Sequence, residues 1–209
     1  MAPEAVVALS ACDARLAAAI GLIGPCTLKR GRGSPYEALL SAIAHQQIHG
    51  SAAAAILGRF RDRCGAGAYP DPAELARTPA AKLRACGLSR AKAAAMRDVA
   101  AKTLDGTVPD RRTMARLDDA TIIERLTAVR GVGRWTAEML LMFTLNRPDI
   151  LPVDDFGIRE GYRLLYAKRQ QPKPHRLAAF GVRWAPYRTT ASWYLWRYVE
   201  HVRAVRRAR

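Results

Sequence analysis

The 209-residue sequence has few cysteines, few aromatic residues and few acidic residues. Its four cysteines form no CxxC pair, which excludes zinc ribbons and iron–sulfur clusters held by four cysteines. No run of about 18 apolar residues occurs, so the sequence predicts no helix that spans a membrane. The first residues also lack the charged and then apolar order of a signal peptide. We therefore expect a cytoplasmic protein with reduced thiols.

The shortage of acidic residues leaves a large excess of positive charge. Lys and Arg number 34 and Asp and Glu number 18, so the formal net charge is +16. Such a charge favours an anionic polymer as the partner, most often nucleic acid. The alternative is mutational drift in a basic proteome of high GC content, because the chain is rich in Ala and has more Arg than Lys. The charge alone does not decide between the two.

Helix-start signals recur along the chain, whereas no alternation typical of β-strands is sustained. Residues 34–37 (Ser-Pro-Tyr-Glu), 71–74 (Asp-Pro-Ala-Glu) and 121–124 (Thr-Ile-Ile-Glu) have the form of capping boxes. Ser89 is expected to cap a helix that reaches Leu104. The sequence therefore predicts an all-α fold.

The helices are expected to form one domain over residues 1–209, built from two lobes. The first lobe would span about 34–145, and the second would combine about 1–33 with 146–209. Such a discontinuous arrangement leaves a cleft between the lobes, where ligand sites tend to lie.

The most specific local pattern is Gly131-Val132-Gly133 between two amphipathic helices. Two glycines around one apolar residue allow a very tight turn, with positive φ available at both ends. The N–H groups of the turn and of the next helix would form a phosphate site that reads no sequence. We expect Val132 to pack between the helices, and Arg130 and Arg134 to add Coulombic attraction. An ordinary helical hairpin with a glycine cap is the alternative for a lone Gly-x-Gly.

Two adjacent acids, Asp154 and Asp155, precede a helix that is expected to begin at Phe156. The extended connection after the hairpin is long enough to return them to its neighbourhood. One carboxylate suffices to cap the helix, so the other is left unexplained. A carboxylate beside a phosphate site repels the ligand that the positive charge attracts. This electrostatic cost indicates a catalytic role for the second carboxylate.

With these motifs in view, the chain resembles the DNA-3-methyladenine glycosylase II family, the alkylpurine branch of the helix–hairpin–helix (endonuclease III-like) superfamily. The resemblance covers about residues 35 to 200, in the compact form without the N-terminal β-rich domain of longer members. Its motifs are residues 126–139 around the hairpin, 151–159 (Leu-Pro-Val-Asp-Asp-Phe-Gly-Ile-Arg), 44–48 with Ala52 and Ala53, 87–92, 184–188 and 193–197.

The resemblance implies a monofunctional glycosylase of base excision repair, which flips a base out of duplex DNA. It would hydrolyse the N-glycosidic bond of alkylated purines such as 3-methyladenine. The catalytic carboxylate would be Asp155, two residues before Gly157, with Asp154 as the cap or as its support. Asp155 would stabilise the oxocarbenium-like sugar and orient or deprotonate water. Bifunctional relatives place a lysine where this chain has Trp135, so no lyase activity is expected.

The resemblance also implies an aromatic pocket that stacks on the cationic base. Trp135, Trp196 and Tyr36 are the candidates for it, with a packing role in the core as the alternative. For Trp193 the core role is preferred.

Flipping a base requires a wedge that fills the gap left in the duplex. The turn at Gln46, Gln47, Ile48 and His49 resembles the wedge loop of the family, and Gln47 is the preferred wedge residue. The alternative is that these amides cap helices.

No metal or cofactor is expected, because the four histidines show no metal-ligand spacing. The exception that the resemblance allows is a monovalent cation held by backbone carbonyls of the hairpin. The expected partner is double-stranded DNA that contains alkylated bases. The protein would be a monomer, associated with the nucleoid if it is bacterial, with no membrane contact.

Two other functions remain open. A non-catalytic helix–hairpin–helix module would explain the charge and the hairpin, but not Asp155, the aromatic residues or the wedge-like turn. A glycosylase for oxidised, deaminated or mismatched bases is the second. The missing cysteine cluster argues against the iron–sulfur branches, and Trp135 argues against a lyase.

Overall fold

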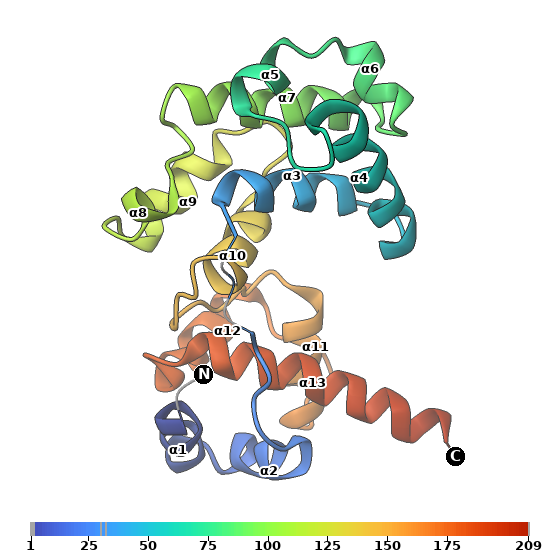
Figure 1. Cartoon of the computed structure of the whole chain (residues 1–209). Helices are drawn as coiled ribbons and strands as arrows, with labels where there is room; N and C mark the ends of the chain where they lie inside the picture. The colour runs from blue at the N-terminus through green and yellow to red at the C-terminus, as the bar shows by residue number, and fades with distance from the viewer. Residues whose placement is uncertain (1–2, 30, 32, 209) are drawn as a thin grey trace. The chain divides into compact units, whose positions relative to one another are not determined.

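The computed structural model describes residues 3–29, 31 and 33–208, and every regular element within these residues is helical (Figure 1). The prediction of an all-α fold is confirmed. The chain divides into two compact units. Unit 1 comprises residues 1–30 and 146–209, and unit 2 comprises residues 31–145. Across the described part of the chain, no helix is both long and apolar enough to cross a membrane.

Unit 2 is built around a central helix, α7, which packs against α3 and α5. Helix α10, which leaves the glycine turn, packs against α9 and α3. The helices of unit 2 are α3 (Pro35–His45), α4 (Gly50–Gly65), α5 (Pro72–Arg77), α6 (Ala80–Ala85), α7 (Arg90–Leu104), α8 (Arg111–Met114), α9 (Asp119–Thr127) and α10 (Arg134–Phe143).

Side-chain caps begin several helices of unit 2, with two differences from the sequence patterns. The Asp71 carboxylate caps α5 and the Ser89 hydroxyl caps α7, as predicted. Helix α9 is capped by Asp118, which accepts the backbone N–H of Thr121 at 2.8 Å and its hydroxyl at 2.9 Å. The prediction that Thr121 caps this helix was therefore wrong, because an aspartate three residues earlier provides a charged acceptor. The prediction of a capping box at residues 34–37 was also wrong, because Ser34 lies at the N-cap of α3 without a side-chain capping bond.

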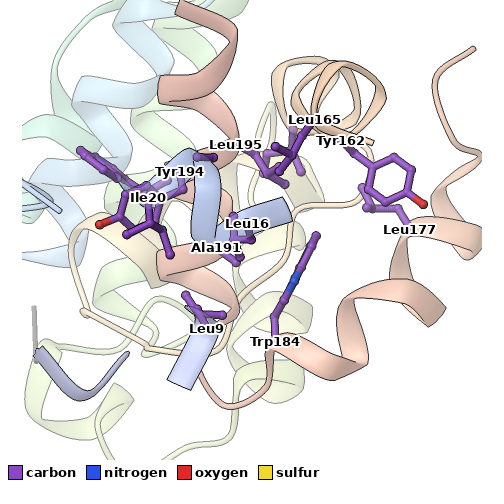
Figure 2. Packing of buried hydrophobic residues seen from close by; sticks show 13 residues of the cluster. Leu9, Leu16, Ile20, Tyr162, Leu165, Leu177, Trp184, Ala191, Tyr194 and Leu195 are labelled. Atoms are coloured by element: carbon purple, nitrogen blue, oxygen red, sulfur yellow. The ribbon is translucent and has the colours of Figure 1, made fainter. Parts of the chain in front are cut away.

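Unit 1 is built around the long helix α13, which packs against α11 and α2 (Figure 1). Its elements are α1 (Pro3–Cys12), α2 (Ala14–Ile23), α11 (Phe156–Leu165), α12 (Pro174–Gly181), the 3-10 turn η1 (Val182–Trp184) and α13 (Arg188–Arg207). Figure 2 shows the buried side chains that these elements contribute to a common core. The cluster comprises Leu9, Leu16, Ala19, Ile20, Ile158, Tyr162, Leu165, Leu177, Trp184, Ala191, Trp193, Tyr194 and Leu195.

A buried carboxylate joins three distant segments of unit 1. Asp13 is 6% exposed and caps α2 by accepting the N–H of Leu16 at 3.1 Å. Its other oxygen accepts the indole N–H of Trp184 at 3.0 Å and the hydroxyl of Tyr166. Burial, together with the hydrogen bond to Asp13, raises the pKa of the Tyr166 phenol. This network fixes the two N-terminal helices against the C-terminal half of the unit.

Candidate active site

The glycine turn joins α9 to α10 within unit 2. Gly131 has φ of +77°, in the left-handed region that favours glycine. The N–H of Val132 donates to the carbonyl of Val129 at 3.1 Å, and the Val132 side chain is buried, as predicted. Gly133 has φ of −95° and is the N-cap of α10. Positive φ, which glycine makes available at both ends of the turn, is therefore adopted at Gly131 and not at Gly133.

Neither the dihedral angles nor the neighbouring atoms require a glycine at position 133. A Cβ added at Gly133 would meet no other atom within 4 Å, and the residue is exposed. Glycine is an acceptable N-cap, but it lacks the side-chain oxygen of the better caps. A bare Cα at this position leaves the first N–H groups of α10 accessible to an anion. The turn thus has the form of a phosphate site.

The two arginines beside the turn are exposed, and their contacts differ. The backbone N–H of Arg130 donates to the Asp98 carboxylate at 2.7 Å. The Arg134 guanidinium donates to Glu138 at 2.9 Å, with the arginine side chain 62% exposed and the glutamate 5% exposed. The charge of Arg134 is therefore partly compensated within the protein.

The predicted wedge turn lies between α3 and α4. Gln46 is the C-cap of α3, and its side-chain amide donates to the carbonyl of Gly131 at 2.8 Å. Gln47 adopts φ of +57° and is exposed, and Ile48 is 38% exposed. The structure thus brings the wedge turn and the glycine turn together. It places the Gln46 amide inside that contact, whereas Gln47 and Ile48 remain on the surface.

Asp155 is the N-cap of α11, in unit 1. Its Oδ1 accepts the N–H of Ile158 at 2.8 Å and the indole N–H of Trp196 at 2.8 Å. Asp154 is exposed, whereas Asp155 is half-buried. Asp154 was expected to be either the cap or a support of Asp155, and the first of these roles is wrong, because the N-cap directly before Phe156 is Asp155. The same aspartate is therefore both the cap and the predicted catalytic residue.

The segment before Asp155 is fixed to the first turn of α13. Arg188 forms a bidentate ion pair with Asp149, at 2.7 and 2.8 Å. The Thr189 hydroxyl accepts the N–H of Ile150 at 3.0 Å and donates to the carbonyl of Arg147 at 2.7 Å. The first turn of α13 therefore holds the segment before Asp155. Two turns further along the same helix, Trp196 holds Asp155 itself.

Gly157 makes the contact between Trp196 and Asp155 possible. A Cβ at Gly157 would lie 2.8 Å from Cδ1 of the Trp196 ring and 3.1 Å from Oδ1 of Asp155. Gly161, one turn later, lies against the backbone of Leu195, where a Cβ would be 2.5 Å from the carbonyl oxygen. The two glycines therefore let α11 approach α13 closely enough for the indole to reach the carboxylate.

The predicted pocket aromatics have different environments. Trp135, the second residue of α10, is 49% exposed. Trp196 donates to Asp155, and Trp193 is buried, as its preferred core role requires. Tyr36 is 8% exposed, and its hydroxyl donates to the carbonyl of Pro70 at 2.9 Å. Phe156, which the sequence did not single out, follows Asp155 directly and is 63% exposed.

No group of three or more His, Cys, Asp or Glu residues in the described chain is placed to hold a metal ion. In the hairpin, the Val129 carbonyl accepts the N–H of Val132 and the Gly131 carbonyl accepts the Gln46 amide. The monovalent cation at the hairpin carbonyls stays a prediction.

A glycine hairpin between two helices and an aspartate held at the start of a third define a helix–hairpin–helix class of DNA-binding protein. Residues 40–186 match the model of the HhH-GPD superfamily of base excision DNA repair proteins, and the chain belongs to this family. The prediction of a base excision repair glycosylase is confirmed.

Relatives with the same architecture extend over almost the whole chain. DNA-3-methyladenine glycosylase 1 of Schizosaccharomyces pombe is 39% identical over 93% of this chain and 86% of that protein. The solved structure of S. pombe 3-methyladenine DNA glycosylase (Mag1) in complex with abasic DNA has a TM-score of 0.81 and 38% identity, and covers 93% and 95% of the two chains. A DNA-3-methyladenine glycosidase from Bacillus halodurans has a TM-score of 0.88 and 35% identity, with 97% and 92% coverage.

Proposed function

We propose that the protein is a monofunctional glycosylase that hydrolyses the N-glycosidic bond of alkylated purines, such as 3-methyladenine, in duplex DNA. The observation that carries the proposal is the Asp155 carboxylate, whose Oδ1 is anchored by two N–H donors at 2.8 Å. The names of the S. pombe and B. halodurans relatives support the substrate class.

Asp155 acts on the sugar of the flipped nucleotide. Cleavage develops positive charge at C1′, and a fixed anion beside it stabilises that charge without reorganising. The C1′–N bond breaks, water adds its oxygen to C1′, and its proton passes to the carboxylate and then to solvent. A purine alkylated at N3 or N7 already carries a positive charge, so it leaves as a neutral base with no general acid. The products are the free base and an abasic site.

The glycine turn holds the DNA backbone near the lesion. The N–H groups at the start of α10 bind a phosphate, and the open space at Gly133 allows its close approach. Arg130 and Arg134 add attraction that does not depend on sequence. Gln47 and Ile48, exposed on the α3–α4 turn, fill the gap left by the extruded base.

Trp135 decides between hydrolysis and lyase chemistry. Its exposed ring stacks on the cationic base. A ring without an amine forms no Schiff base with C1′, so the DNA strand stays intact.

We also propose that the protein acts as a monomer, in the same cellular compartment as the DNA, and without a metal cofactor. Base release is therefore expected to persist in EDTA.

Asp155→Asn tests the proposal. The amide oxygen of asparagine accepts the same two N–H bonds and caps α11 as well as aspartate does, so only the charge is lost. We expect the rate of base release from methylated genomic DNA to fall at least about 100-fold. Chromatography of the free bases measures this rate. Binding to the same DNA is expected to persist.

Asp154→Asn is the matched control, because it removes an adjacent exposed carboxylate and leaves the cap in place. Its rate of base release is expected to stay within about twofold of the wild type. Wild-type protein that binds DNA and releases no free base would instead identify a non-catalytic DNA-binding module.

A further inference from the structure

We infer that Gln46 is a positioning residue whose side-chain amide locks the wedge turn to the phosphate-binding hairpin. The inference rests on the proposed function and changes the role of Gln46, which the sequence places among the residues that contact DNA. The contact that carries it is the hydrogen bond of 2.8 Å from Gln46 Nε2 to the Gly131 carbonyl oxygen, between residues 85 positions apart.

The turn at residues 46–49 is held at both of its ends. The backbone N–H of Gln46 donates to Ile43 at 3.3 Å, and the carbonyl of His49 accepts the N–H of Ala53 at 3.0 Å. Between these bonds, Gln47 is kept in the left-handed region, at φ of +57°. A residue with a Cβ stays in this conformation only where its surroundings impose it. The bonds at the two ends of the turn therefore fix the backbone of Gln47 and, with it, the direction in which the exposed side chain leaves the turn.

Helix α7 contacts both the end of α3, next to the wedge turn, and the hairpin. The Lys92 ammonium donates to the carbonyl of Ala44 at 2.8 Å, at the negative end of the α3 dipole, and partial burial lowers its pKa. The Asp98 carboxylate accepts the backbone N–H of Arg130 at 2.7 Å. Between these residues, the Ala95 methyl lies 3.4 Å from the place where a Gly131 side chain would begin.

Lys92, Ala95 and Asp98 are spaced three residues apart and therefore share one face of α7. That face sets the positions of α3 and of the hairpin separately. The Gln46 amide is the direct bond between the two turns. The bonds from Lys92 to Ala44, from Arg130 to Asp98 and from Gln46 to Gly131 together make the wedge turn and the hairpin one rigid platform.

A rigid platform matters for base flipping because the wedge must enter the duplex at a fixed distance from the gripped phosphate. Without the Gln46 bond, the hairpin would still bind phosphate, and the wedge would enter less often in the productive position. The loss should therefore appear in the extrusion of a paired base, and not in binding to the DNA backbone.

The test uses Gln46→Met, which keeps the length of the side chain and removes the donor. Gln170→Met is the matched control, an exposed glutamine of unit 1. Each protein is given two duplexes that carry 3-methyladenine, one with the lesion paired with thymine and one with it opposite an abasic site. We expect Gln46→Met to lower kcat/KM about tenfold on the paired lesion, as the loss of one hydrogen bond would, and less than twofold on the unpaired one. Equal losses on both duplexes, or no loss on either, would overturn the inference.

Hydrogen exchange of the free protein tests the lock without any substrate. In Gln46→Met, the amides of residues 46–49 and 129–133 are expected to exchange about tenfold faster, and those of α13 at the wild-type rate. Unchanged exchange in the two turns would refute the lock. Wild-type protein that releases no base from either duplex would refute the proposed function instead, and the exchange rates would still decide the role of Gln46.

Discussion

The indole N–H of Trp196 donates to Asp155 at the same oxygen that caps α11, and each of the two bonds is 2.8 Å long. One donor belongs to the backbone of α11 and the other to a side chain of α13. The carboxylate can turn away only by breaking both bonds. A charge held in this way needs no rearrangement when the sugar becomes positive, which is the condition for electrostatic stabilisation of the transition state.

Trp196→Phe is expected to slow base release about 10- to 100-fold, because it removes one hydrogen bond to a charged group and keeps an aromatic ring. The loss should lie in kcat, since the carboxylate loses one of the two bonds that orient its Oδ1, while KM changes less than about threefold. Single-turnover kinetics on a duplex with one alkylated purine measure the effect.

Trp193→Phe is the matched control, one turn of α13 away and buried in the core of unit 1. It should lower thermal stability and leave the single-turnover rate within about twofold. If Trp196→Phe raised KM and left kcat unchanged, Trp196 would act by stacking on the base and not by orienting Asp155.

The two hairpin glycines are predicted to respond differently to alanine. Gly133→Ala should fold normally, because φ of −95° suits alanine and the added Cβ meets open space. Its affinity for undamaged and damaged duplexes should fall together, by about tenfold, because the methyl group keeps the phosphate away. Gly131→Ala should cost about 1 kcal/mol of stability or more, because its φ is +77°. Equal thermal shifts in the two variants would show that Gly133 has a structural role instead.

Sequence patterns predicted the helical class, the hairpin and the start of α11 at Phe156, because each depends on residues close together in the chain. The sequence left the capping residue of α11 open, since either of two adjacent aspartates satisfies the pattern and the cap is decided by the dihedral angles at Asp155. The bond from Trp196 to Asp155 spans 41 residues, and no local pattern contains it. Its one trace in the sequence is Gly157, whose missing side chain makes room for the indole ring.

The Gln46 bond was missed for a related reason. The amide of a glutamine in a turn can contact DNA, cap a helix or bind another loop, and only the fold brings Gly131 within reach. The three-residue spacing of Lys92, Ala95 and Asp98 indicates a shared helix face, but it does not identify what that face holds. Contacts between separate turns depend on packing, which the local sequence does not specify.

Asp13→Asn is expected to destabilise unit 1 by about 1–3 kcal/mol. Asparagine can still cap α2, but its NH2 group would replace the oxygen that accepts from Trp184 and Tyr166. The buried indole N–H would then face another donor. Thermal unfolding should show a decrease of about 2–4 °C for each kcal/mol. Asp71→Asn is the control, because that exposed aspartate caps α5 with a single bond to Ala73; a loss of stability equal to that of Asp13→Asn would mean that capping alone explains both.

Borohydride trapping tests the role assigned to Trp135. Wild-type protein should form no covalent adduct with alkylated duplex DNA, because position 135 carries no amine. Trp135→Lys should release base more slowly, because it loses the stacking ring, and should yield an adduct. The amine attacks C1′ and loses a proton as the base leaves, and the C1′–O4′ bond then breaks, with a proton added at O4′, to give an iminium. Borohydride reduces this iminium to a stable amine. Trp135→Met has a side chain of similar length without an amine, so it should release base slowly and form no adduct. An adduct with the wild type would contradict hydrolysis as its mechanism. No adduct with the lysine variant would show that a side chain at the second residue of α10 does not reach the sugar.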